Sequence, residues 1–137
     1  MARLATMNPD GAADLVHVTF ALLDDDRVVT AVDHKPKRTT RLQRLANLQR
    51  DPRATLLVDH YDERWDRLWW VRMRARAEIL ALDGPDARAH AGAVDALVDR
   101  YDHYREVRPT GPVIRLTVDE WLGWAADPGS ITAPSSR

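Results

Sequence analysis

Positive charge gathers in one short segment of this chain, residues 35–44. Both lysines of the chain lie there, and arginines and threonines follow within a few residues. The cationic and hydroxyl side chains of the segment are Lys35, Lys37, Arg38, Thr39, Thr40, Arg41 and Arg44. Cations and hydroxyls beside the N–H groups of a helix N-terminus form a good phosphate site. Pro36 stiffens the loop and so lowers the entropy lost when these side chains bind one ligand.

Two other interpretations of the basic segment remain open. Arg41, Arg44 and Arg50 also have the spacing of an ordinary solvated helix face. An exposed basic stripe can instead neutralise a nucleic-acid backbone, but the chain has a formal net charge of -1 and no recognised nucleic-acid-binding motif. The glycine-rich loops of P-loop and Rossmann proteins are missing from the sequence. The residues by themselves therefore indicate an anion site without naming its ligand.

The elements that must position this segment are mostly strands. Alternating, β-branched and aromatic stretches predict strands at residues 2–7, 13–22, 27–33, 53–61, 67–82, 113–118 and 121–126. A helix is expected from a cap at Thr39 or Thr40 to the stop at residues 50–52, and a second helix after residues 84–86. A turn is expected at residues 8–11. The basic segment then joins the third strand to the first helix.

The strand expected at residues 67–82 has the clearest pattern in the sequence. Its odd positions from 69 to 79 are apolar, whereas arginine or glutamate fills the even positions from 72 to 78. A period of two over this length indicates a long strand with one buried face. Closure into a barrel is the natural way to use such strands, so we expect a mainly β (α+β) fold.

Size and composition limit the class of protein. A chain of 137 residues with 45% hydrophobic and 30% charged residues is typical of one globular domain, which we place at residues 1–126 before a disordered tail at 127–137. There are no cysteines, which excludes disulfides and thiolate chemistry. No apolar run approaches a membrane span, and the N-terminus is too short for a secretory signal before its first turn. We therefore expect a cytoplasmic protein. The histidines show no metal-ligand spacing.

Several motifs in order resemble the pyridoxamine 5'-phosphate oxidase-like, FMN-binding split-barrel superfamily. They are "RLAT" at 3–6, "DG" at 10–11, "NLQRDPR" at 47–53, "LLVD" at 56–59 and "AEIL" at 77–80 after a tryptophan-containing strand. Within the superfamily, the chain is most similar to an actinobacterial branch of flavin- or deazaflavin (coenzyme F420)-dependent oxidoreductases. The resemblance extends over nearly the whole chain.

The resemblance implies a six-stranded split β-barrel with two helices, which forms a homodimer and binds two cofactors in grooves between the subunits. It places the cofactor phosphate on Lys35, Lys37, Arg38, Thr39, Thr40 and Arg41, with Arg44 and Asn47 one turn further along. It places the ring against the second strand, at Val16, His17, Val18 and Thr19. Relatives commonly have proline where this chain has His17. Trp70 is a candidate for stacking on a flat cofactor, and so is Trp124, because the C-terminal strand of the family approaches the ring.

The function that follows from the resemblance is an oxidoreductase that transfers hydride or electrons between FMN or coenzyme F420 and a small molecule. The arginines at 41, 44, 72 and 74 favour coenzyme F420, whose longer acidic tail needs additional cations. The alternative is a flavin- or haem-binding protein of the same fold without turnover. No general acid or base can be assigned from these residues.

Overall fold

The computed structural model of the chain describes residues 1–32 and 38–127, and for residues 38–42 it describes the backbone alone. Within these ranges the strands are β1 (Ala2–Met7), β2 (Ala13–Val18), β3 (Ala21–Leu22), β4 (Arg27–Ala31), β5 (Arg53–His60), β6 (Trp69–Leu80) and β7 (Val113–Ala125). The helices are α1 (Arg38–Arg50), α2 (Ala87–Arg100) and α3 (Asp102–Glu106), with short 3-10 turns at Trp65–Arg67 and Gly84–Asp86. None of the described helices is long and apolar enough to cross a membrane.

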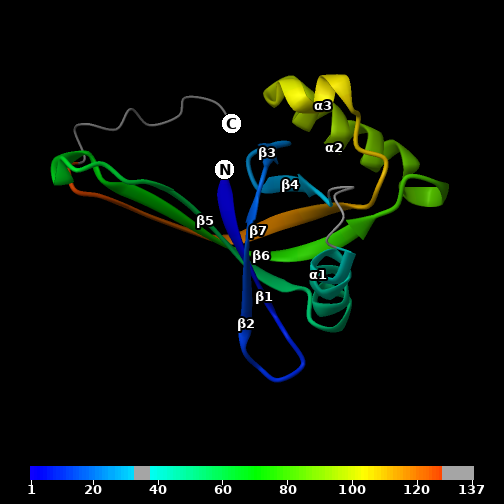
Figure 1. Ribbon diagram of the computed structural model, residues 1–137, viewed down its shortest axis with the longest axis horizontal. Coiled ribbons are helices and arrows are strands. Elements are labelled where there is room, and N and C mark those ends of the chain that lie inside the picture. Colours follow the sequence, from blue (N-terminus) through cyan, green and yellow to red (C-terminus); the bar gives the residue numbers. More distant parts are fainter. Residues whose placement is uncertain (33–37, 128–137) are drawn as a thin grey trace.

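The strands form one antiparallel sheet in the order β2-β1-β5-β6-β7-β4-β3. β2 and β3 lie at opposite edges of this sheet, yet only Thr19 and Phe20 separate them along the chain. A link of two residues cannot cross a flat seven-stranded sheet, because neighbouring strands lie about 4.8 Å apart. The sheet must therefore curl until its edges approach, which confirms the expected split barrel (Figure 1).

The described residues form seven strands, not the six that the resemblance implied, and the strand boundaries also differ from those expected. The strand expected at residues 13–22 breaks into β2 and β3, because the chain passes from one sheet edge to the other at Thr19 and Phe20. The two strands expected at residues 113–118 and 121–126 form the single strand β7. A bulge joins its halves: Arg74 lies opposite Glu120 but Ala75 opposite Val118, which leaves Asp119 as the extra residue.

The distal ends of β5, β6 and β7 extend away from the helices as a long arm (Figure 1). The arm follows from the length of β6, 12 residues, and of β7, 13 residues, which pair along their whole length. The loop between β5 and β6 exposes Tyr61 and Trp65. None of the described helices covers the arm, where Tyr61, Trp65 and Trp124 are exposed.

Two apolar clusters stabilise the domain, one on each face of the sheet. On the inner face, α1 packs Leu48 against a cluster that includes Leu4, Leu56, Met73 and Leu116. On the opposite face of β4, α2 contributes the buried residues Ala93, Val94 and Leu97, which pack with Val29, Leu80, Val113 and Tyr104. β4 is thus covered on both sides, which explains why its residues from Val28 to Ala31 are all buried.

A clamp between the helices and the β2–β3 crossing holds the barrel closed. Tyr101 Oη accepts a hydrogen bond from the Phe20 backbone N–H (3.2 Å) and donates one to the Phe20 carbonyl (3.0 Å). The Arg100 guanidinium donates to the same carbonyl (2.9 Å) and lies 4.2 Å from the centre of the Phe20 ring. The crossing is therefore ordered by α2 and the residue after it, through contacts distant in sequence.

Candidate functional site

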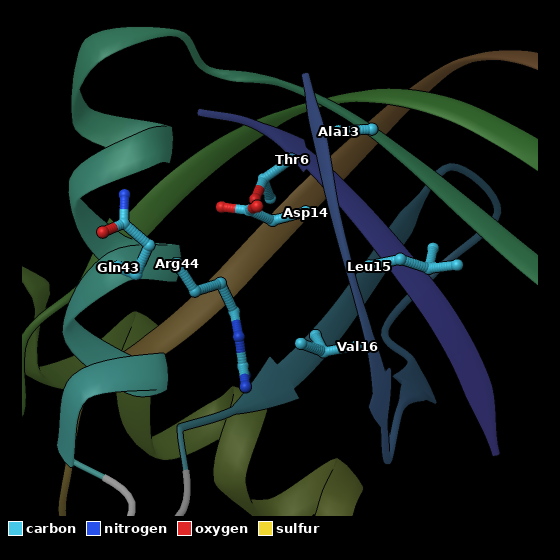
Figure 2. Close-up of a pocket in the computed structure, with 7 residues that line it drawn as sticks. All are labelled: Thr6, Ala13, Asp14, Leu15, Val16, Gln43 and Arg44. Carbon is cyan, nitrogen blue, oxygen red and sulfur yellow. The ribbon is translucent and has the colours of Figure 1, made fainter. Parts of the chain in front are cut away.

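A pocket of about 400 Å³ lies between β2 and α1 (Figure 2). Its volume falls within the range of small-molecule sites. Its lining residues are Thr6, Ala13, Asp14, Leu15, Val16, Gln43 and Arg44. They come from β1, β2 and α1, so the hairpin and the first helix build the site together.

β2 forms one wall of the pocket and is also the edge strand of the sheet. Along β2 the half-buried or buried residues Asp14, Val16 and Val18 alternate with the exposed residues Leu15 and His17. An edge strand presents unpaired backbone N–H and C=O groups on its free side. The pocket therefore combines apolar side chains with the backbone donors and acceptors of a strand edge.

The turn that leads into β2 follows from its sequence. Asn8 Oδ1 accepts hydrogen bonds from the backbone N–H groups of Asp10 (3.0 Å) and Ala12 (3.1 Å). Gly11 has φ +84°, a left-handed conformation that glycine adopts without strain. The expected turn at residues 8–11 is thus confirmed, and it fixes where β2 begins.

Asn47 is the centre of a buried polar network at one end of the pocket. Its side chain is completely buried, and Nδ2 donates to Asp14 Oδ2 (2.8 Å) and to Thr6 Oγ1 (3.1 Å). Asn47 Oδ1 accepts from Gln43 Nε2 (2.8 Å). Both amide hydrogens of Asn47 are thus donated to side chains of β1 and β2. In this structure the residue therefore attaches α1 to the hairpin.

Arg44 supplies the positive charge of the described pocket. Its side chain is half-buried and points toward the end of the pocket where α1 begins (Figure 2). Lys35 and Lys37 lie outside the described residues. Arg38, Thr39, Thr40 and Arg41 form the first turn of α1, and their side chains also lie outside the described part. Among the described residues, α1 reaches the pocket lining at Gln43 and Arg44, which follow this first turn. The phosphate contacts of the segment stay a prediction.

The four ring-lining candidates on and after β2 divide between three places. Val16 lines the pocket, and His17 is exposed on the other face of the strand. Val18 is buried in the core. The hydroxyl of Thr19 lies 2.7 Å from that of Tyr104, in the region where the chain crosses to β3. Only Val16 of these four residues therefore lines this pocket.

The two tryptophan candidates lie together, but far from the pocket along the sheet. Trp70 on β6 is directly opposite Trp124 on β7 and opposite Asp59 on β5. Trp70 is half-buried and Trp124 is 48% exposed. Both belong to the arm, and neither lines the pocket.

Five described pocket residues were not predicted from the sequence: Thr6, Ala13, Asp14, Leu15 and Gln43. Asp14 shares the face of β2 with Val16 and Val18, a position that alternation assigns to the inside. A charged residue at an inward position, next to a turn, is a signal that could have identified it. Gln43 lies one helical turn before Asn47, the same face of α1.

A second pocket of about 540 Å³ lies on the outer face of the sheet. Arg53, Arg74 and Arg76 line it, with Asp119 and Glu120 at its edge. Arg74 lies 3.7 Å from Glu120, and Arg72 lies 3.9 Å from it. Arg53 binds the Asp51 carboxylate with two hydrogen bonds (2.8 and 3.0 Å), which lower the pKa of Asp51 to about 2. The row of arginines on β6 thus has partial counter-charges within the chain.

Metal chemistry finds no support in the described geometry. Among residues 1–32 and 38–127, no three histidine or acidic side chains gather where they could hold an ion. His90 is buried, and its Nε2 lies 2.8 Å from the Gly111 carbonyl oxygen, so the ring has a structural partner. His60 stacks on Trp69 in the arm.

Comparison with known proteins establishes the class of this protein. Residues 1–125 match the pyridoxamine 5'-phosphate oxidase family, and the chain belongs to that family. No curated protein is similar enough in sequence to count as a relative.

Solved structures show the same fold at low sequence identity. The conserved hypothetical protein Rv2991 of Mycobacterium tuberculosis matches with 23% identity and a TM-score of 0.72, over 98% of this chain and 82% of that one. An FMN-binding protein of Syntrophomonas wolfei matches with 13% identity and a TM-score of 0.62, over 90% of this chain and 76% of that one. The haem storage protein HutZ of Vibrio cholerae matches with 13% identity and a TM-score of 0.65, over 90% of this chain and 84% of that one.

Proposed function

We propose that this protein binds FMN or coenzyme F420 in the pocket between β2 and α1 and acts as a small oxidoreductase. The observation that carries the proposal is the position of that pocket in a chain of the pyridoxamine 5'-phosphate oxidase family. The pocket is lined by Gln43 and Arg44 of α1, the helix into which the basic segment runs. The FMN-binding protein of S. wolfei with the same fold is in keeping with a flavin ligand.

The chemistry of the lining fits such a cofactor. The start of α1, Arg44 and the proposed clamp of Lys35, Lys37, Arg38, Thr39, Thr40 and Arg41 suit a phosphate. Val16, whose side chain shares the inner face of β2 with Asp14, offers apolar surface for a chain or a ring. The free edge of β2 offers backbone hydrogen bonds to polar atoms of a ring.

Each group then has a separable role. The bound cofactor supplies the hydride or electron transfer itself. The basic segment, including Arg44, holds the phosphate of the cofactor. The apolar wall of β2 excludes water from the part of the cofactor that lies against it. The backbone N–H groups along the edge of β2 are suited to stabilise negative charge on the ring. His17 and Thr19 keep their proposed contacts with the ring only if a second protomer completes the site.

We further propose that the protein is a homodimer with each cofactor held between subunits. The outer face of the sheet carries apolar residues that no part of the described chain covers: Leu15 is 65% exposed, Leu122 45% and Trp124 48%. Arg3, which pairs with Asp59, and Arg72, near Glu120, provide both charge signs on the same face. Such a mixed face can pair with a second copy of itself. A partner protomer would bring Trp70 and Trp124 to a pocket that they cannot reach within one chain.

The choice between the two cofactors rests on the arginines. Arg44 lines the pocket, but Arg72 and Arg74 lie on the outer face of the sheet and near Glu120. Within one protomer, Arg72 and Arg74 therefore lie on the wrong face of the sheet to add cations to the proposed phosphate site. They favour the acidic tail of coenzyme F420 only if the dimer brings them to the partner's pocket.

A side-by-side titration of the apoprotein with FMN and coenzyme F420, followed by cofactor fluorescence at two salt concentrations, tests the proposal. We expect micromolar or tighter binding of at least one cofactor. Failure of both to bind would contradict it. Haem belongs in the same experiment, because HutZ is a haem storage protein with this fold. Tight binding of haem alone would favour the non-catalytic alternative.

A further inference from the structure

We propose that Asp14 binds the polyhydroxylated chain that joins the phosphate to the ring in both FMN and coenzyme F420. This inference rests on the proposed function, since it names the part of the same ligand that one residue recognises. Asp14 lines the pocket, on the wall opposite α1, and Figure 2 shows it beside Thr6 and across from the helix. Among the described lining residues, Asp14 is the acidic one and Arg44 the basic one.

The carboxylate of Asp14 is oriented by two amides. Oδ2 accepts a hydrogen bond from Asn47 Nδ2 (2.8 Å), and Oδ1 accepts one from Asn8 Nδ2 (3.2 Å). Each carboxylate oxygen has two lone-pair sites. One protein donor on each oxygen therefore leaves acceptor capacity on both, directed by a fixed carboxylate plane.

The two amides are themselves held from opposite sides. Asn8 Oδ1 accepts from two backbone N–H groups of the turn, which fixes its side chain in the hairpin. Asn47 is completely buried and accepts from Gln43. A carboxylate anchored to both the turn and α1 loses little freedom when a ligand binds, which raises affinity for a ligand that matches it. Asn8 and Asn47 act here as positioning residues.

The sign of the charge decides which part of the ligand meets Asp14. An ionised carboxylate only accepts hydrogen bonds, so it repels a phosphate and the carbonyl oxygens of a ring. Hydroxyls of the chain can donate to it. They also follow the phosphate directly in the cofactor, as Asp14 and Thr6 follow the Arg44 end of the pocket (Figure 2). Thr6 Oγ1, which accepts a hydrogen bond from Asn47, adds a hydroxyl beside Asp14.

Asp14 could instead serve only to fasten the hairpin to α1. That role predicts a loss of stability with no preference for one ligand over another. Ligand recognition predicts that the preference for a hydroxylated chain disappears with the carboxylate. The two roles therefore predict different ratios between the affinity for a hydroxylated ligand and the affinity for the same ligand without hydroxyls. A general loss of stability lowers both affinities and leaves this ratio unchanged.

The test compares FMN with an analogue that carries a phosphate on an N10-pentyl chain without hydroxyls. We expect the wild type to bind FMN about tenfold or more tightly than the analogue, since hydrogen bonds to a charged group are strong. In Asp14→Ala this ratio should fall close to one, with FMN losing the affinity. Asp10→Ala, on the same turn but outside the pocket lining, is the matched control and should keep the ratio. Ribitol 5-phosphate and pentyl phosphate make the same comparison without a ring, whichever ring the protein prefers.

Two outcomes are decisive, and a second variant keeps the test possible. A ratio that stays the same in Asp14→Ala overturns the inference while leaving the proposed function intact. A wild type that binds neither FMN, coenzyme F420 nor the phosphate fragments overturns the proposed function and this inference with it. Should Asp14→Ala fail to fold, Asp14→Asn keeps an oxygen for Asn47 and carries the test, with a smaller but measurable fall in the ratio expected.

Discussion

The hydroxyls of Thr19 and Tyr104 lie 2.7 Å apart and join the β2–β3 crossing to α3. Tyr104 is buried in the cluster under α2, so this bond connects a helical segment to the point where the sheet edges meet. Thr19 was a candidate for cofactor contact, and its hydroxyl here has a partner within the protein. The crossing is therefore a structural joint of the barrel as well as the end of the pocket strand.

Tyr104→Phe should destabilise the protein by about 1 kcal/mol, because it removes one hydrogen bond from a buried site. The midpoint of urea unfolding measures this change. Cofactor affinity should stay the same if Thr19 serves the fold alone. Tyr61→Phe, at an exposed position in the arm, is the control and should leave the midpoint unchanged. A loss of affinity in Tyr104→Phe at full stability would show instead that Thr19 reaches the ligand.

Asn47→Leu should cost about 2–4 kcal/mol in the free energy of unfolding. The reason is that Thr6, Asp14 and Gln43 each lose a partner in or beside a buried region. Gln49→Leu on the exposed side of α1 is the matched control for the change in helix surface. Urea unfolding monitored by circular dichroism gives both values, and equal values for the two variants would contradict the network.

The proposed dimer can be tested on its outer face. Leu122→Arg puts a charge on the apolar part of the proposed dimer face, beside Arg72 of the same chain, so association would have to bury an unpaired charge. Sedimentation at micromolar concentration should then show a monomer, and cofactor affinity should fall. Leu82→Arg has the same exposure, 45%, but lies in the loop after β6. If both variants sediment like the wild type, the dimer does not form through this face.

The proposed phosphate clamp predicts that changing Lys37 and Arg38 together to alanine weakens cofactor binding about 100-fold or more. Two charge-assisted contacts to the phosphate would be lost. Riboflavin has no phosphate, so its affinity should not change in the same variant. Arg88→Ala, an exposed arginine of α2, is the control for general charge. An unchanged affinity for FMN and for coenzyme F420 would remove these residues from the site.

The Asp51–Arg53 pair predicts an acid-dependent part of the stability. Hydrogen bonds from Arg53 lower the pKa of Asp51 from 3.8 to about 2 in the folded protein. Because the folded-state pKa is depressed, the contribution is complete above the unfolded pKa and is lost as the pH falls from about 4 to about 2. Asp51→Asn should therefore be less stable than the wild type near neutral pH, and the difference should narrow over this window. Urea unfolding at several pH values measures it, and a constant difference would contradict the assignment.

Local patterns along the chain were enough for much of the fold. The alternation at residues 67–82 predicted β6 and its buried face, and the proline and glycine at residues 8–11 predicted the hairpin turn. These features depend on side-chain period and on backbone conformation, which neighbouring residues decide. The division of residues 13–22 into β2 and β3 had no such signal, because both parts have strand-like sequences. The break comes from sheet closure, and Tyr101 and Tyr104 bind the crossing from about 80 residues away.

The candidate site shows the same division. The basic segment that runs into α1 was evident in the sequence, since charge and residue type are local. Asp14 and its partners were not, because Asn8, Asn47 and Gln43 meet it only after α1 packs on the hairpin. The sequence by itself determined the strands, the turn and the charge of the site, which follow from short-range periodicity and composition. Only the tertiary structure decided where the strand at residues 13–22 divides, which side chains enter the pocket and which arginines lie on the outer face of the sheet. Those properties depend on contacts between segments far apart in the chain.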